Sequence, residues 1–198
     1  QNWLLSHNES SDRIKLITSG IDLESAHPRL RQQTDRHSLG LPSKGLVVGF
    51  VGRWSEEKNP LDFLDLAMAC ADLNDITFVM AGTGSQRSRI ERRMRLEASR
   101  LKHFRLLGMV EDPVKLIANL DLLVIPSLFD GRPLVALESL GTGTPILASA
   151  VGGLPDLSMR PEVLTNIRAS VRIFAQNAVD ENKMSKAFKS ALLNQVPA

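Results

Sequence analysis

The chain of 198 residues has the length of one or two domains, and a single domain of this size can bury a substantial core. Its 43% hydrophobic and 23% charged residues are typical of a globular protein, and the formal net charge of +2 disfavours nucleic-acid binding. No apolar run approaches the roughly 18 residues of a membrane-spanning helix, and the single cysteine, Cys70, suits a reducing compartment because it cannot form an internal disulfide.

Residues 1–40 are polar and irregular, apart from a short apolar run at 14–17 that fits one strand. We expect them to be a lead-in segment to one domain over 41–198. From residue 46 onward, short apolar runs typical of buried strands alternate with segments of helical period. The predicted strands are 46–51, 76–81, 104–107, 122–127 and 145–149. The predicted helices are 60–73, 85–101, 112–119, 133–141 and a closing helix at 180–192.

Strands that are apolar on both faces and alternate with helices indicate a parallel sheet covered by helices on each side. The sequence therefore predicts an α/β domain with a doubly wound, Rossmann-like parallel sheet. Ligands bind to such sheets outside the carboxyl ends of the strands. The residues that follow each predicted strand are therefore the candidates for a site.

The first predicted strand is followed by Gly52, Arg53 and Lys58. Two cations at the carboxyl end of a strand are well placed for a diphosphate, because Arg supplies a planar fork of donors and Lys a compact charge. The alternative is a solvated loop in which these cations form local ion pairs with Glu56 and Glu57.

The second predicted strand is followed by Gly82 and Gly84 at the start of a helix. Glycines here would let the backbone approach an anion closely, although a tight strand-to-helix turn explains them equally well. The loop after the third predicted strand contains Met109 and Val110, and its backbone could meet the edge of a nucleotide base.

The fourth predicted strand is followed by the sequence DGRPLVALE. Pro133 suits the first position of a helix, with Gly131 and Arg132 before it. Asp130 would then stand just ahead of the helix and Glu138 further along it, which makes them two acceptors for an elongated ligand. The alternatives are that Asp130 caps the helix and that Glu138 faces solvent.

Glycines also follow the fifth predicted strand, at Gly152 and Gly153, and turn the backbone near the same edge of the sheet. Five loops at this edge thus carry glycines, cations and acids in turn. Together they describe a cleft for a diphosphate that carries two hydroxyl-rich groups.

Six motifs, in this order, resemble the nucleotide-sugar-binding C-terminal domain of retaining glycosyltransferases with the GT-B fold, the "group 1" family. They are RIKLITSGIDL, GFVGRWSEEKNP, VMAGTGS, LLGMVED, DLLVIPSLFDGRPLVALESLGTGTPILAS and VGGLPDL, which together cover residues 13–157. The resemblance implies the C-terminal half of a GT-B architecture, with the N-terminal acceptor domain absent from this chain.

The E-x7-E motif of that family falls on Asp130 and Glu138. By resemblance, Asp130 and the backbone of Gly131–Leu134 hold the donor sugar and diphosphate, and Glu138 binds the ribose hydroxyls. Arg53 and Lys58 match the positions that neutralise the leaving diphosphate. The implied catalytic residues are Arg53, Lys58 and Asp130. The implied donor-binding residues are Gly52, Gly82, Gly84, Met109, Val110, Gly131, Arg132, Pro133, Leu134 and Glu138.

The implied reaction moves a sugar from a nucleoside diphosphate of the UDP or GDP type to an acceptor with retained anomeric configuration, as in polysaccharide biosynthesis. We expect no cofactor and no metal, because cations and helix N–H groups can stabilise the leaving diphosphate, no D-x-D motif is present and the four histidines are scattered. The expected partners are the nucleotide sugar, the acceptor domain, and an acceptor glycan or lipid-linked sugar, but not nucleic acid. This chain alone is expected to bind the donor without transferring its sugar.

Three features depart from the family pattern. Asp130 replaces the usual Glu and shortens the reach toward the sugar by one methylene. Arg132 stands where an aromatic residue is common. The segment 158–175 does not fit the pattern, so its role at the edge of the cleft stays open.

Eight lysines and arginines lie between residues 87 and 105, against Glu91 and Glu97. One interpretation is a solvated helix face. The other is contact with a partner or an anionic membrane, which would place a cytoplasmic protein peripherally at the inner face of the membrane. The apolar stripe of this helix lacks bulky aromatic residues, which argues against insertion.

Two other functions are compatible with the same fold. A nucleotide-sugar epimerase is disfavoured because its histidine- and arginine-rich signature is missing. A non-enzymatic module, either a degenerate nucleotide-binding domain or a membrane-docking one, would show no nucleotide affinity.

Overall fold

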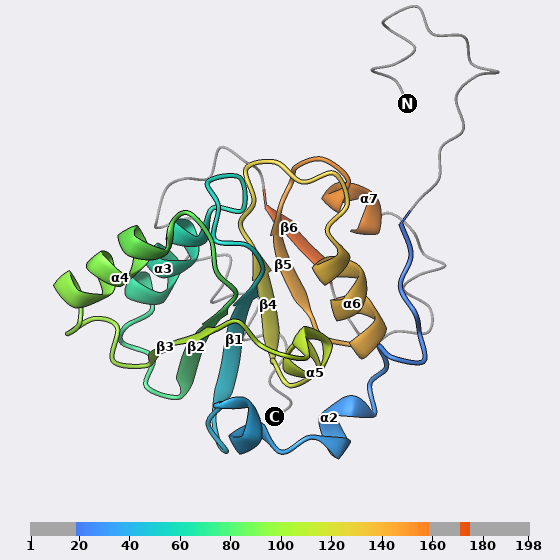
Figure 1. Ribbon diagram of the computed structural model, residues 1–198, viewed down its shortest axis with the longest axis horizontal. Helices are drawn as coiled ribbons and strands as arrows, with labels where there is room; N and C mark the ends of the chain where they lie inside the picture. The colour runs from blue at the N-terminus through green and yellow to red at the C-terminus, as the bar shows by residue number, and fades with distance from the viewer. Residues whose placement is uncertain (1–18, 159–170, 175–198) are drawn as a thin grey trace, which may run out of the picture.

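The computed structural model describes residues 19–158 and 171–174 (Figure 1). Within this part of the chain, a six-stranded sheet has the order β3-β2-β1-β4-β5-β6, and every neighbouring pair is parallel. The predicted Rossmann-like fold class is therefore confirmed. The strands are β1 (Leu46–Val51), β2 (Ile76–Ala81), β3 (Phe104–Gly108), β4 (Leu122–Ile125), β5 (Ile146–Ser149) and β6 (Val171–Phe174).

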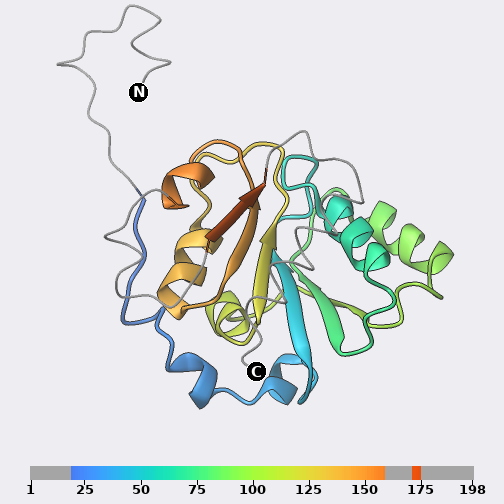
Figure 2. The same cartoon turned by 180° about the vertical axis from the view of Figure 1, so that it is seen from behind.

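Helices cover both faces of the sheet (Figures 1 and 2). Buried residues of α3 (Pro60–Ala69) and α4 (Arg87–Leu96) belong to the core cluster on one face. Those of α5 (Pro113–Ala118) and α6 (Leu134–Thr142), together with buried residues of α7 (Leu154–Ser158), belong to the cluster on the other face. Two separate cores are the result expected for a parallel sheet whose strands are apolar on both faces.

Phe63 of α3 lies at the centre of the first core. Its ring centroid is 5.8 Å from that of Phe50, 6.0 Å from that of Phe78 and 5.8 Å from that of Phe104. These three partners lie on β1, β2 and β3, so one helical side chain joins three strands. Pro60 starts this helix, as its fixed φ and missing N–H favour.

The segment before the sheet contains the short helix α2 (Leu30–Gln33) and a 3₁₀ turn, η2 (Arg36–Leu39). Both are tied to Asp121, which precedes β4. Its carboxylate forms ion pairs with Arg31 and, at 2.9 Å, with Arg36, and it accepts a hydrogen bond from the backbone N–H of Val47 at 2.8 Å. The described part of the lead-in is thus packed on the domain, whereas the sequence analysis predicted irregular chain.

The predicted strands agree closely with the structure, and the bounds of β1 and β2 are those expected. The helices α3, α4 and α5 are shorter than predicted. After α3 and α4 the chain continues in hydrogen-bonded turns, and α4 and α5 also begin later than predicted. The short helix α7 and the strand β6 were not foreseen. The predicted strand at 14–17 and the helix at 180–192 lie outside the described residues, and the proposed domain boundary stays a prediction.

The position of Phe63 leads to a test of the first core. We expect Phe63→Ala to lower the free energy of unfolding by about 3–5 kcal/mol, because it leaves a cavity between three other rings. Leu23→Ala is the control, since that side chain is 67% exposed and should change stability by less than about 0.5 kcal/mol. Urea unfolding followed by circular dichroism measures both, and equal effects would contradict this account of the core.

Candidate functional site

The strand order reverses between β1 and β4, and this reversal places the candidate site. The chain leaves β1 toward β2 on one side, whereas β4 continues to β5 on the other, so the loops after β1 and β4 diverge from a common crevice. These two loops lie together at the top of Figures 1 and 2. The backbone N–H of Leu128 donates a hydrogen bond to the carbonyl of Glu57 at 2.9 Å, which joins them directly.

A largely buried ion pair spans the two loops. Lys58 Nζ lies 2.6 Å from Asp130 Oδ2 and 3.2 Å from Glu57 Oε1. Asp130 is only 5% exposed, and Ser127 Oγ donates to the same carboxylate oxygen at 3.4 Å. An unpaired carboxylate at this depth would be costly, so Lys58 stabilises it. The local ion pair considered for Lys58 is thus present with Glu57, but its shorter contact is with Asp130, which the sequence analysis did not foresee.

The start of α6 differs by one residue from the prediction. Pro133 is the N-cap, with φ −68° and ψ 128°, and the helix begins at Leu134. The alternative in which Asp130 caps this helix is therefore wrong. Arg53 lies in the loop after β1 and Arg132 in the loop after β4, and neither forms an ion pair with another described residue. The two guanidinium groups are thus available to an anion.

The loop after β5 packs against the backbone of Asp130 and Gly131. Gly152 has φ +55°, and a Cβ at this position would lie 1.6 Å from the carbonyl oxygen of Asp130. Gly153 donates its N–H to the same oxygen at 3.1 Å, and a Cβ there would lie 2.1 Å from the carbonyl oxygen of Gly131. Only glycine permits this approach, and the contact helps to hold the Asp130 carboxylate in place.

The glycines after β2 have a comparable packing role. A Cβ on Gly82 would lie 1.9 Å from the carbonyl oxygen of Gly52, and one on Gly84 would lie 2.5 Å from that of Trp54. The backbone N–H of Trp54 also donates to the carbonyl of Thr83 at 2.9 Å. The structure therefore explains both glycines by the close packing of two loops.

Trp54 was missed by the sequence analysis. Its side chain is 2% exposed and belongs to the core cluster with α3 and α4, although it follows the exposed Arg53 in a polar loop. The indole anchors this loop, so that Arg53 projects from a fixed base. A large aromatic residue within an otherwise polar loop was the signal that could have indicated it.

The ends of β1, β2 and β3 enclose a mostly apolar pocket of about 390 Å³. Five of the predicted site residues line it, and one of them, Met109, is 74% exposed. The pocket is lined by Val51, Gly52, Arg53, Ala81, Gly82, Thr83, Met109, Val110 and Pro113. The predicted residues Gly52, Arg53, Gly82, Met109 and Val110 thus meet in space, and Gly84 does not line the pocket.

Glu138 lies in the second turn of α6 and is half-buried rather than facing solvent. Burial raises the pKa of its carboxyl above the ordinary value of 4.5, and the nearby Asp112 carboxylate raises it further. Asp112 caps α5, where its side chain accepts a hydrogen bond from the N–H of Lys115. Glu138 is therefore near Asp112, in the loop between β3 and α5, although it does not itself line the apolar pocket.

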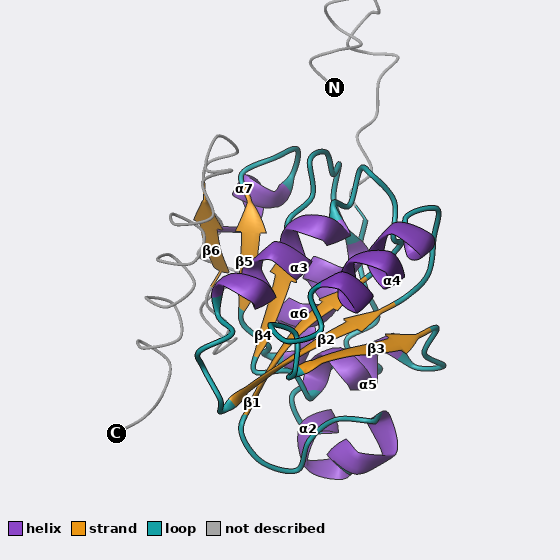
Figure 3. Ribbon diagram, turned by 90° about the vertical axis from the view of Figure 1, so that its left-hand side faces the viewer, coloured by secondary structure: helices purple, strands orange, loops and turns teal. Residues whose placement is uncertain are grey.

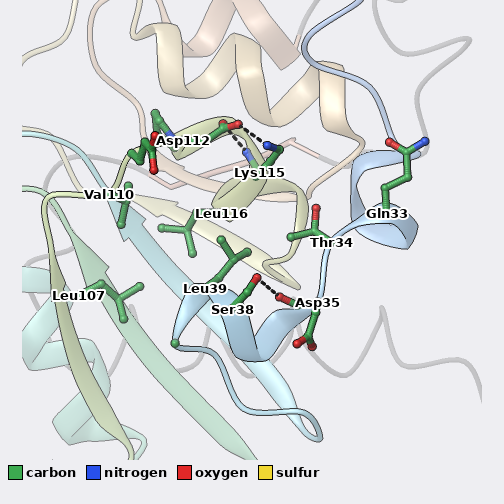
Figure 4. Close-up of a pocket in the computed structure, with 13 residues that line it drawn as sticks. Gln33, Thr34, Asp35, Ser38, Leu39, Leu107, Val110, Asp112, Lys115 and Leu116 are labelled. Atoms are coloured by element: carbon green, nitrogen blue, oxygen red, sulfur yellow. Dashed lines mark hydrogen bonds and ion pairs between the residues drawn. The ribbon is translucent and has the colours of Figure 1, made fainter.

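A larger hollow of about 880 Å³ lies beside this site, between η2 and the start of α5 (Figure 4). Val110 and Pro113 line both hollows. Its charged groups are the carboxylates of Asp35, Glu111 and Asp112 and a single cation, Lys115, which pairs with Asp112 at 3.2 Å. This excess of negative charge makes it unsuited to a diphosphate.

Two further observations concern the described residues as a whole. They contain no group of three or more His, Cys, Asp or Glu side chains placed to hold a metal ion. None of the helices in 19–158 has the length and hydropathy needed to cross a bilayer.

Comparison with known proteins identifies the family. The sequence pattern described as "Glycosyl transferases group 1" matches residues 45–180. The chain belongs to this family. The match includes the loops after β1, β2, β3, β4 and β5, so the candidate site lies within the part that is shared.

Individual relatives agree with this assignment. The chain is 32% identical over 145 residues to the UDP-Gal:α-D-GlcNAc-diphosphoundecaprenol α-1,3-galactosyltransferase of Escherichia coli, a match that covers 71% of this chain and 38% of the relative. It resembles sucrose-phosphate synthase from Thermosynechococcus elongatus with a TM-score of 0.70 and 25% identity, over 91% of this chain and 44% of that one. The fold is also that of Anabaena HepE in complex with UDP-glucose, with a TM-score of 0.68 and 20% identity over 96% and 52% of the two chains.

The packing of Gly152 on Asp130 can be tested by mutation. We expect Gly152→Ala to destabilise the domain by about 2–3 kcal/mol, since the new Cβ meets a backbone oxygen and the positive φ disfavours alanine. Gly131→Ala is the matched control, because a Cβ there has no atom within 4 Å. Thermal unfolding of the two variants measures the difference. A neutral Gly152→Ala would show that the loop after β5 is not held against Asp130.

Proposed function

We propose that this chain is the donor-binding part of a glycosyltransferase that moves a sugar from a nucleoside diphosphate, of the UDP or GDP type, to an acceptor with retention of anomeric configuration. The observation that carries the proposal is the meeting of Arg53, Lys58 and the start of α6 at the reversal of the sheet, beside an apolar pocket. Family membership and the UDP-glucose complex of the similarly folded Anabaena protein support it.

The donor would lie along the crevice with its base in the apolar pocket and its ribose beside Glu138. Its diphosphate would then reach Arg53, Arg132 and the free N–H groups at the start of α6. Cleavage of the sugar–phosphate bond leaves charge on the diphosphate, and donors already in place around that charge lower the barrier. In this proposal the cations do the work that a metal ion does in other transferases, so neither a metal nor a cofactor is required.

Asp130 has two tasks in this proposal. Before the donor binds, its carboxylate compensates the charge of Lys58 at 2.6 Å. When the donor binds, sugar hydroxyls would donate to Asp130 and the diphosphate would share Lys58. Because Asp is one methylene shorter than Glu, its carboxylate stays close to Lys58. It would therefore compete with the diphosphate for Lys58 and lower the affinity for a nucleotide that carries no sugar.

The acceptor side of the reaction requires parts beyond the donor site. The chain spans 38% of the E. coli relative, and we propose that an N-terminal acceptor domain completes the enzyme. The name of that relative specifies a diphosphoundecaprenol substrate, which supports a lipid-linked sugar or glycan as acceptor and a place at the cytoplasmic face of a membrane in polysaccharide biosynthesis. No observation favours an epimerase or a non-enzymatic module.

Calorimetric titration with UDP, GDP and ADP tests the donor site and identifies the base. We expect saturable binding of one nucleotide, weakened about tenfold to a hundredfold by Glu138→Ala, because a charge-assisted hydrogen bond to the ribose is lost. Glu24→Ala, an exposed carboxylate away from the site, is the control and should bind as the wild type does. Absence of binding for all three nucleotides would contradict a working donor site in this chain.

The raised pKa of Glu138 gives the site a pH dependence. As pH falls, Glu138 gains a proton at a higher pH than an ordinary Glu does, so nucleotide binding should weaken there. The free energy of unfolding depends on pH in the opposite sense. The native state binds this proton more tightly than the unfolded state does, so the contribution of Glu138 to stability is lost as pH rises through the pKa of the folded state. We therefore expect Glu138→Gln to bind more weakly yet unfold at a slightly higher urea concentration at neutral pH. Loss of both binding and stability would indicate a structural role only.

Asp130→Asn removes the charge and keeps the shape of the side chain, so it tests whether Asp130 lowers the affinity for a nucleotide without a sugar. We expect the affinity for UDP to rise about fivefold, since Lys58 is released to the diphosphate, while the affinity for UDP-glucose does not rise in step. Ser127→Ala removes only the 3.4 Å contact to Asp130 and should change neither affinity. Equal loss of both affinities in Asp130→Asn would contradict this role.

A further inference from the structure

The outer side of α4 carries three exposed arginines, Arg89, Arg92 and Arg95, each three residues after the last. Helical neighbours three apart share one face. None of the three forms an ion pair with any other residue in the described ranges. Two other arginines of the helix are engaged: Arg87 pairs with Glu91 at 2.8 Å, and Arg93 pairs with Asp65.

The opposite side of α4 is anchored to the domain. Ile90 is fully buried in the first core, and Met94 packs against it. The helix forms the left-hand edge of the domain in Figure 1 and turns toward the viewer in Figure 3. Its arginines are therefore held on a rigid surface that faces away from the sheet.

Leu96, at the end of α4, is 73% exposed beside these arginines. Beyond it, Arg100, Lys102 and Arg105 are also exposed and continue the positive charge. We call Arg89, Arg92, Arg95 and Leu96 the basic face. With a chain net charge of only +2, this concentration of cations leaves the remainder of the molecule net negative.

We propose that the basic face docks on the surface of an anionic lipid bilayer. Each Lys or Arg near such a surface contributes about 1 kcal/mol of attraction. Because the rest of the chain carries a net negative charge, the basic face is the side that turns toward the lipid. Exposed Leu96 suits shallow contact with the headgroup region. Nucleic acid fits less well, because the basic face has no aromatic side chain on which bases could stack.

The position of α4 keeps the donor crevice open during docking. The loops after β1 and β4, between which the donor would bind, lie at the top of Figure 1, whereas α4 lies at the side of the domain. A bilayer against the basic face therefore lies beside the crevice without covering it. The contact goes beyond the proposed donor site and does not depend on nucleotide binding.

Co-sedimentation of the 198-residue chain with vesicles tests the proposal. We expect binding to vesicles of equal parts phosphatidylglycerol and phosphatidylcholine, weakened by added salt, and none to pure phosphatidylcholine. Arg92→Gln with Arg95→Gln should reduce the partition coefficient about thirtyfold, the value for two charges at about 1 kcal/mol each. Arg29→Gln with Lys44→Gln removes two exposed cations elsewhere and should leave it unchanged.

The alternatives give distinct results. Equal losses in the two double variants would show non-specific attraction and overturn the proposal, as would binding to neutral vesicles that both variants retain. Tighter binding of a duplex RNA than of the anionic vesicles would assign the basic face to nucleic acid instead. Nucleotide titration of Arg92→Gln with Arg95→Gln should match the wild type, so a failed donor site and a failed membrane contact are told apart. An unchanged unfolding midpoint shows that the double variant is folded.

Discussion

Strand β1 is hydrogen-bonded to β2 on one side and to β4 on the other, and this pairing decides where the site lies. Since the two neighbours continue in opposite directions across the sheet, the loops at the carboxyl ends of β1 and β4 leave a crevice between them. Cations supplied by the first loop and a carboxylate supplied by the second come together there. Lys58 and Asp130 are 72 residues apart in sequence, and this reversal brings them together in space.

Because Asp130 is buried, its contacts with the neighbouring loops depend on one another. Its carboxylate needs Lys58, its backbone accepts the close approach of Gly152, and its loop is joined to the one after β1 through Leu128. Movement of any one of these would disturb the others. This coupling favours a preformed site, which is the condition under which fixed charges stabilise a developing charge without a cost of reorganisation.

The charges of the chain fall into two groups with different partners. In the crevice, cations and carboxylates are mixed and partly compensate each other, as suits a ligand that combines phosphates with hydroxyl groups. On α4, the arginines of the basic face form no ion pair with another described residue, because the nearby Glu91 and Glu97 pair with Arg87 and Arg100 instead. Unpaired arginines of this kind suit an extended anionic surface. The weak net charge of the whole chain conceals this separation.

The sequence by itself determined the fold class, because strands that are apolar on both faces leave few arrangements other than a helix-covered parallel sheet. It also indicated most residues of the candidate site, since residues just after parallel strands must lie at one edge of the sheet. Only the tertiary structure decided the pairing of Lys58 with Asp130, the burial of Trp54 and the half-buried state of Glu138. Each of these depends on contacts between loops that are distant in the chain, and local periodicity carries no information about such contacts.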